Sequence, residues 1–98
     1  MLLISMFSNS QFNQDISLWN TSNVTNMSDM LKNSKFNKDI SKWNTCNVTN
    51  MSFMFNKLKF NQDISYWNTL NITNMGEIFK NCINMFDNKE FKFYLIAY

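Results

Sequence analysis

The fold is decided by the stretch FNQDISLWNTSNVTNM at 12–27, because the chain repeats it twice more. The later copies read FNKDISKWNTCNVTNM at 36–51 and FNQDISYWNTLNITNM at 60–75. Each copy begins 24 residues after the previous one. A fixed period of this length is typical of proteins built from stacked, equivalent units that cannot bury an apolar face alone.

The period divides the chain without any Pro-rich, Gly-rich or charged linker. We expect three full repeats at 12–35, 36–59 and 60–83, a partial N-terminal repeat at 1–11, and a degenerate repeat or C-terminal cap at 84–98. The register is lost after Cys82, where Asn84 stands in place of the Phe that opens each full repeat.

Each repeat contains two local patterns. Met27, Met30, Leu31 and Ser34 follow the i, i+3, i+4, i+7 spacing of one helix face, which predicts short helices near 26–34, 50–58 and 74–82. The DISxWN half is rich in β-favouring residues, which predicts short strands near 15–19, 39–43 and 63–67.

These elements favour an α/β repeat fold, a leucine-rich-repeat-like solenoid with one short parallel strand and one short helix in each 24-residue unit. A pure β-solenoid is the alternative, since each helix has only about two turns. Stacking would line up equivalent residues. We expect structural ladders of tryptophan and asparagine side chains, formed by Trp19, Trp43, Trp67, Asn23, Asn47 and Asn71.

Composition argues against an enzyme. The chain has no His and only one Gly, which excludes Ser-His and Cys-His nucleophile pairs, His-ligated metal sites and Gly-rich phosphate loops. All nine cationic side chains are Lys, and the net charge is only +2, so we expect no nucleic-acid binding. We therefore expect no catalytic residues and no cofactor.

The acidic residues Asp15, Asp39 and Asp63 form one column and are the weak candidates for a metal site. With the Asn two residues earlier in each repeat, they supply the oxygen ligands that Ca²⁺ prefers. The alternative, which we favour, is that each Asp closes its own turn by accepting backbone N–H groups. A disulfide between Cys46 and Cys82 is not expected, because one and a half periods separate them.

Variable positions within the repeat are candidates for partner contact. Leu18, Lys42 and Tyr66 occupy one such column and are the predicted partner-binding residues. Six asparagines start N-x-S/T strings, which are glycan acceptors in secreted eukaryotic proteins but also arise by chance in an Asn-rich repeat: Asn20, Asn23, Asn26, Asn47, Asn50 and Asn71.

Neither end of the chain resembles a membrane span. The apolar runs Met1–Phe7 and Phe91–Tyr98 are far shorter than the ~20 residues that cross a bilayer. The first run also lacks the basic start and cleavage site of a secretory signal, and no lipidation cysteine follows it.

The string FN-x-D-I-x-x-W…N-V-T-N-M resembles the repeats of BspA-like leucine-rich-repeat surface proteins, and more closely the DUF285 repeats of mycoplasma surface lipoproteins. The likeness covers about residues 1–83. It implies a non-enzymatic solenoid with a binding or adhesive surface, displayed at the cell surface or secreted. It carries no catalytic residues over to this chain.

We therefore expect a repeat scaffold that binds an unknown protein or glycan partner. The alternative is structural: a fragment of a longer repeat array that associates end to end through its exposed ends. A decayed gene product without a function is the third reading.

Overall fold

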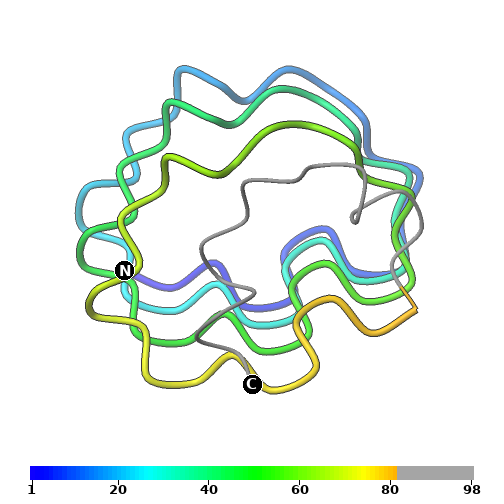
Figure 1. The fold of residues 1–98 in the computed structure, drawn as a ribbon. Coiled ribbons are helices and arrows are strands. Elements are labelled where there is room, and N and C mark those ends of the chain that lie inside the picture. Colours follow the sequence, from blue (N-terminus) through cyan, green and yellow to red (C-terminus); the bar gives the residue numbers. More distant parts are fainter. Residues whose placement is uncertain (82–98) are drawn as a thin grey trace.

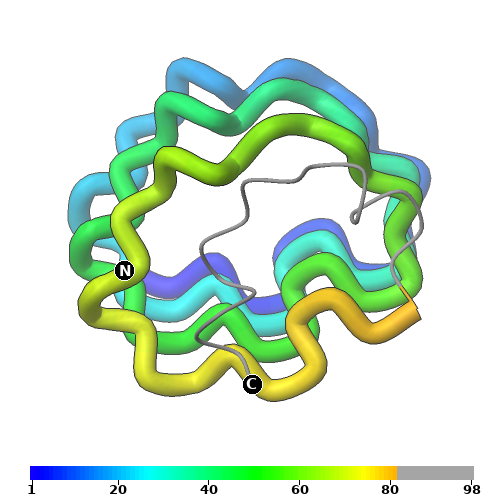
Figure 2. Tube along the Cα trace, viewed as in Figure 1, coloured from blue at the N-terminus to red at the C-terminus, as the bar shows by residue number. Residues whose placement is uncertain are grey.

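Successive passes of the chain around the molecule lie one over the next, and each pass takes 24 residues. The computed structural model describes residues 1–81. Isolated parallel bridges join Leu2 to Asn26, Asn26 to Asn50 and Asn50 to Asn74. Figure 1 and Figure 2 show the resulting loops, from blue through green to yellow, lying almost over one another. We call each pass a winding.

Overlapping turns form the side of each winding at 28–33, 52–57 and 76–81. Their N–H groups alternate in direction. The Met30 N–H donates to the Met27 carbonyl in the same winding at 3.3 Å, whereas the Asp29 N–H donates to the Ser52 carbonyl of the next winding at 2.9 Å. A helix would satisfy such donors within its own segment. Here every second donor ties two windings together.

The helices predicted near 26–34, 50–58 and 74–82 are wrong, because residues 1–81 contain no helix. The apolar spacing is that of a helix face, but overlapping turns bury the same positions. Met27, Met30 and Leu31 are all fully buried. Residue 82, the last of the third predicted helix, lies outside the described residues.

The overlapping turns require left-handed backbone at two positions per winding. These positions have φ between 52° and 59° and are occupied by Ser5, Asn9, Asp29, Asn33, Phe53, Lys57, Glu77 and Asn81. None is glycine, although left-handed backbone costs an L-residue roughly 1–2 kcal/mol. The cost recurs every winding and is offset by the bonds between windings.

The strands predicted near 15–19, 39–43 and 63–67 are also wrong. These segments contain two linked turns. The Asp15 carboxylate accepts the Ser17 N–H at 2.9 Å, and the Ile16 carbonyl accepts the Trp19 N–H at 3.1 Å. The same pair of turns recurs in the next two windings, at Asp39 and Asp63.

The predicted α/β repeat, a leucine-rich-repeat-like solenoid, is therefore contradicted, and so is the pure β-solenoid. Residues 1–81 have no helix, and extended pairing among them is limited to isolated bridges. The parallel bridges fall at Asn26, Asn50 and Asn74, where helices were expected to begin. Turn chemistry, supplied by Asn, Asp and Ser, replaces both kinds of element.

Identical or similar apolar side chains from successive windings fill the interior. Phe36 and Phe60 are fully buried and stack at 6.3 Å between ring centroids. Further buried columns are Ile16, Ile40 and Ile64; Val24, Val48 and Ile72; and Met27, Met51 and Met75. The predicted cap at 84–98 lies outside the described residues.

Candidate functional site

The predicted partner-binding residues lie at the tips of equivalent turns. Each follows the turn made by Asp15, Asp39 or Asp63 and precedes a tryptophan whose N–H closes the next turn. Their neighbours, such as Ile16, point inward and are buried. Leu18 is 96% exposed, Tyr66 is 77% exposed and Lys42 is exposed. We call Leu18, Lys42 and Tyr66 the rim surface.

The rim surface combines two large apolar side chains with one cation. Scattered apolar residues are common on protein surfaces. What distinguishes these three is that the turn geometry holds them at one position of three successive windings, while the side chains themselves differ. The arrangement can contact a partner without any change to the buried columns.

The carboxylates of the aspartate column accept backbone N–H groups within their own turns. Asp39 accepts the Ser41 N–H at 2.8 Å, and Asp63 accepts both the N–H and the hydroxyl of Ser65, at 2.8 and 2.6 Å. Among residues 1–81, no three potential metal ligands of the His, Cys, Asp or Glu type are grouped together.

Hydrogen bonds lower the pKa of two carboxyl groups in this column. For Asp15 the main cause is the Ser17 hydroxyl, followed by the Ser17 N–H. For Asp39 it is the Ser41 hydroxyl, followed by the Ser41 N–H, and the negative charge of Asp15 opposes the shift. Both carboxylates are therefore stabilised as acceptors within their turns.

The tryptophan column runs through the interior and joins the windings. The rings of Trp19, Trp43 and Trp67 stack at 6.4 and 6.3 Å between centroids. The Trp43 indole N–H donates to the Ile16 carbonyl at 3.0 Å, and the Trp67 indole N–H donates to the Ile40 carbonyl at 2.9 Å. Trp43 and Trp67 are buried, whereas Trp19 in the first winding is 37% exposed.

Asparagine amides also connect successive windings. Asn47 Nδ2 donates to the Ser22 carbonyl at 2.7 Å, and Asn71 Nδ2 donates to the Cys46 carbonyl at 2.6 Å. Asn23, one period earlier, is exposed, and its carbonyl accepts the amino terminus at 3.2 Å. At Asn47 and Asn71, the nitrogen that would carry a glycan is thus already hydrogen-bonded.

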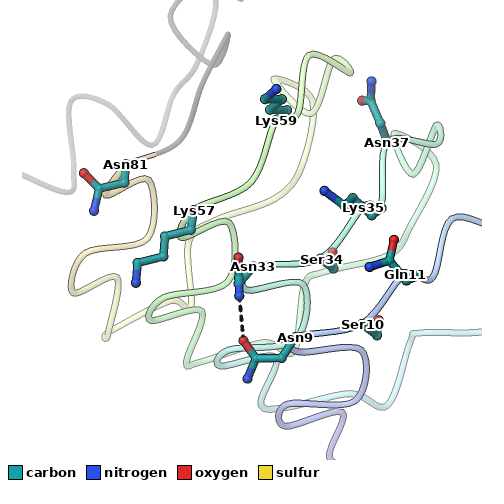
Figure 3. Close-up of a pocket in the computed structure, with 10 residues that line it drawn as sticks. All are labelled: Asn9, Ser10, Gln11, Asn33, Ser34, Lys35, Asn37, Lys57, Lys59 and Asn81. Atoms are coloured by element: carbon teal, nitrogen blue, oxygen red, sulfur yellow. Dashed lines mark hydrogen bonds between the residues drawn. The ribbon is translucent and has the colours of Figure 1, made fainter.

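A polar groove of about 560 Å³, which was not predicted from the sequence, lies at one corner of the windings. Figure 3 shows its lining, which includes Lys35, Lys57 and Lys59 together with amide side chains such as Asn9 and Asn33. We call it the lysine groove. The sequence indicates part of this groove, since Lys35 and Lys59 are one period apart. Lys57 belongs to another column, so its place beside them could not be predicted from the period.

A second hollow, of about 310 Å³, opens at the first winding. Its lining is mainly apolar and includes Leu3, Met6, Trp19 and Val24. Exposed apolar side chains surround it: Met1, Leu2 and Ile4. In the second winding the equivalent side chains are covered, since Trp19 stacks on Trp43 at 6.4 Å between ring centroids and Val48 and Met51 are fully buried.

No helix in the part of the chain that the structure describes is long and apolar enough to cross a membrane. Cys46 is a free, half-buried cysteine. Cys82, its partner in the disulfide that the spacing argues against, lies outside the described residues.

Comparison with known proteins gives one family match. The family model described as "Mycoplasma protein of unknown function, DUF285" matches residues 2–94. Searches of curated proteins and of solved structures returned no match.

Proposed function

This chain belongs to the DUF285 family of mycoplasma proteins of unknown function, and we propose that it is a non-enzymatic binding module. Its rim surface would contact a protein or glycan partner. The observation that carries the proposal is one exposed position occupied by Leu18, Lys42 and Tyr66 in three otherwise similar windings.

The contrast between constant and variable columns supports this role. Buried apolar positions carry the same or a similar residue in each winding, as at Ile16, Ile40 and Ile64. A scaffold of this kind keeps its fold while the exposed column changes to suit a partner. The apolar and aromatic members would supply most of the contact energy.

The likeness to BspA-like surface proteins forms part of the proposal. It rests on the repeated FN-x-D-I-x-x-W…N-V-T-N-M string and not on an α/β architecture, which residues 1–81 lack. Display at the cell surface or secretion follows from that likeness. The non-enzymatic role rests on composition, above all on the absence of His.

Binding of the labelled protein to a glycan array and to immobilised extracellular-matrix proteins tests this role. We expect Leu18→Ser and Tyr66→Ser to weaken binding to a positive ligand at least fivefold, because each removes exposed contact area. Leu70→Ser is the matched control, since Leu70 is 87% exposed but lies on the following turn. Equal binding by all three variants would overturn the role of the rim surface.

A second function, end-to-end association, is favoured by the first winding. The carbonyls of Leu2, Ile4 and Met6 have no hydrogen-bond donor among residues 1–81, whereas the equivalent carbonyls of Asn50, Ser52 and Met54 each accept an N–H from the winding before. With the apolar hollow beside them, they form an open stacking edge. Sedimentation velocity tests this: growth of the sedimentation coefficient with concentration, abolished by Leu2→Lys with Met6→Lys, supports association. A concentration-independent monomer rules it out.

A further inference from the structure

The lysine groove concentrates positive charge that no described acidic side chain neutralises. Its lining contains Lys35, Lys57 and Lys59 and no Asp or Glu. Within residues 1–81, none of the three forms an ion pair, whereas Lys32 and Lys80 lie 3.8 and 3.3 Å from the carboxylates of Asp29 and Glu77.

Amide and hydroxyl side chains line the groove together with these ammonium groups. Asn33 Nδ2 donates to Asn9 Oδ1 at 2.9 Å, and both side chains are exposed in the groove. Asn37, on the opposite wall, donates from Nδ2 to Asn61 Oδ1 at 3.1 Å. Such groups still have acceptor or donor capacity to spare and suit the hydroxyls of a sugar.

We propose that the lysine groove binds an anionic oligosaccharide, a sulfated or uronic-acid glycan. The ammonium groups pair with its sulfates or carboxylates, and the amides bind its hydroxyls. The volume of about 560 Å³ lies within the range of ligand sites, and the lining is polar enough for a carbohydrate. Lys35 and Lys59 stand on adjacent windings, so the cations follow the stacking direction.

The lining argues against two other anionic ligands. It contains no aromatic side chain on which a nucleobase would stack, and the chain has no Arg to read base edges. A single small anion is usually held by converging backbone N–H groups. Here the charges are instead spread over three long side chains.

This site goes beyond the rim surface and does not depend on it. The groove is lined by 9–11, 33–35, 37, 57, 59 and 81, whereas the rim surface belongs to the turns at 16–19, 40–43 and 64–67, on another side of the windings (Figure 1). Substitutions at the rim surface should leave glycan binding in the groove unchanged.

Isothermal titration calorimetry with a heparin-derived hexasaccharide tests the proposal. We expect binding at 50 mM NaCl that weakens at 200 mM NaCl, because salt screens exposed charges. Lys35→Gln combined with Lys59→Gln should weaken binding roughly tenfold. Lys32→Gln combined with Lys80→Gln removes the same charge elsewhere and should change it less than twofold.

Three comparison ligands complete the experiment: the desulfated hexasaccharide, inorganic sulfate and a single-stranded DNA 12-mer. The proposal requires that each bind more weakly than the sulfated hexasaccharide. It is overturned by no binding of the hexasaccharide, by equal losses in the two double variants, or by any comparison ligand that binds as tightly as the sulfated hexasaccharide. Retained circular dichroism of each variant shows that the fold is intact.

Discussion

At the scale of single residues, short polar side chains set the path of the backbone. In the first full repeat, Asp15, Asn20 and Asn26 each accept the N–H of a serine two residues later, at 2.9 to 3.1 Å. These turns need neither Pro nor Gly, which explains how a chain with no Pro and one Gly changes direction so often.

Asp39→Asn should flatten the dependence of stability on pH. The hydrogen bonds from Ser41 hold the pKa of Asp39 below its usual 3.8, so the stability that the carboxylate contributes is present above that value and is lost as pH falls through the lower folded-state pKa. Asn keeps the acceptor but cannot titrate. Urea unfolding from pH 7 to about pH 2 should show wild type and variant converging in acid.

The converse change is the control for that series. Asn44 holds the equivalent type of turn by accepting the Cys46 N–H at 3.0 Å. Asn44→Asp should add a loss of stability below about pH 4. If Asp39→Asn leaves the pH profile unchanged, the Ser41 hydrogen bonds do not stabilise the carboxylate.

Gly76→Ser should stabilise the protein by about 0.4–1 kcal/mol. Gly76 does not use the left-handed region open to glycine, and serine occupies the equivalent positions 28 and 52. An added Cβ would meet the Asn74 side-chain oxygen at 3.4 Å, an ordinary contact. Chemical denaturation measures the gain, and a loss of stability would show that the third winding differs locally from the second.

At the scale of the element, the overlapping turns hydrogen-bond to the next winding and also bury an apolar face. Left-handed residues at both ends of the segment 29–33 let alternate N–H groups face the next winding. Inward positions meanwhile keep the spacing of a helix face. Phe53 is the least suited of these left-handed residues, because bulky side chains tolerate positive φ poorly.

Phe53→Asn should therefore be more stable than Phe53→Ala by roughly 0.5–1 kcal/mol. Both variants lose the contact in which Lys32 Nζ lies 5.1 Å from the Phe53 ring centroid, so the comparison isolates backbone preference. Thermal denaturation of the two variants decides the matter. Equal stability would mean that the left-handed backbone at this position carries no cost.

The tryptophan column offers a matched pair of variants. Trp43→Phe removes the indole N–H that the Ile16 carbonyl accepts from the next winding and leaves that carbonyl with the Trp19 N–H alone, so it should cost about 0.5–1.5 kcal/mol. Trp19→Phe should cost less, since Trp19 is 37% exposed and its indole N–H bonds to no residue within 1–81. Equal costs from chemical denaturation would show that the ring, and not its N–H, joins the windings.

At the scale of the whole molecule, the 24-residue period was readable because each winding repeats the same inward side chains. The path of the backbone between those side chains could not be predicted from the sequence, since a helix face and overlapping turns bury the same positions. The lysine groove was even harder to predict from the sequence. It combines Lys57 from a column of asparagines with Lys35 and Lys59, and only the path of the turns brings those columns together.

Removing one whole winding tests whether the period governs the entire molecule. Deletion of 36–59 joins two equivalent points, so that Met27 would again lie over an equivalent methionine, now Met75. Deletion of 36–47 removes only half a winding and places buried positions opposite exposed ones. We expect the first variant to unfold cooperatively at a lower temperature than the full chain, because one interface between windings is lost. The second should lack a cooperative transition in circular dichroism and calorimetry. Similar behaviour of the two variants would mean that contacts one period apart do not control stability.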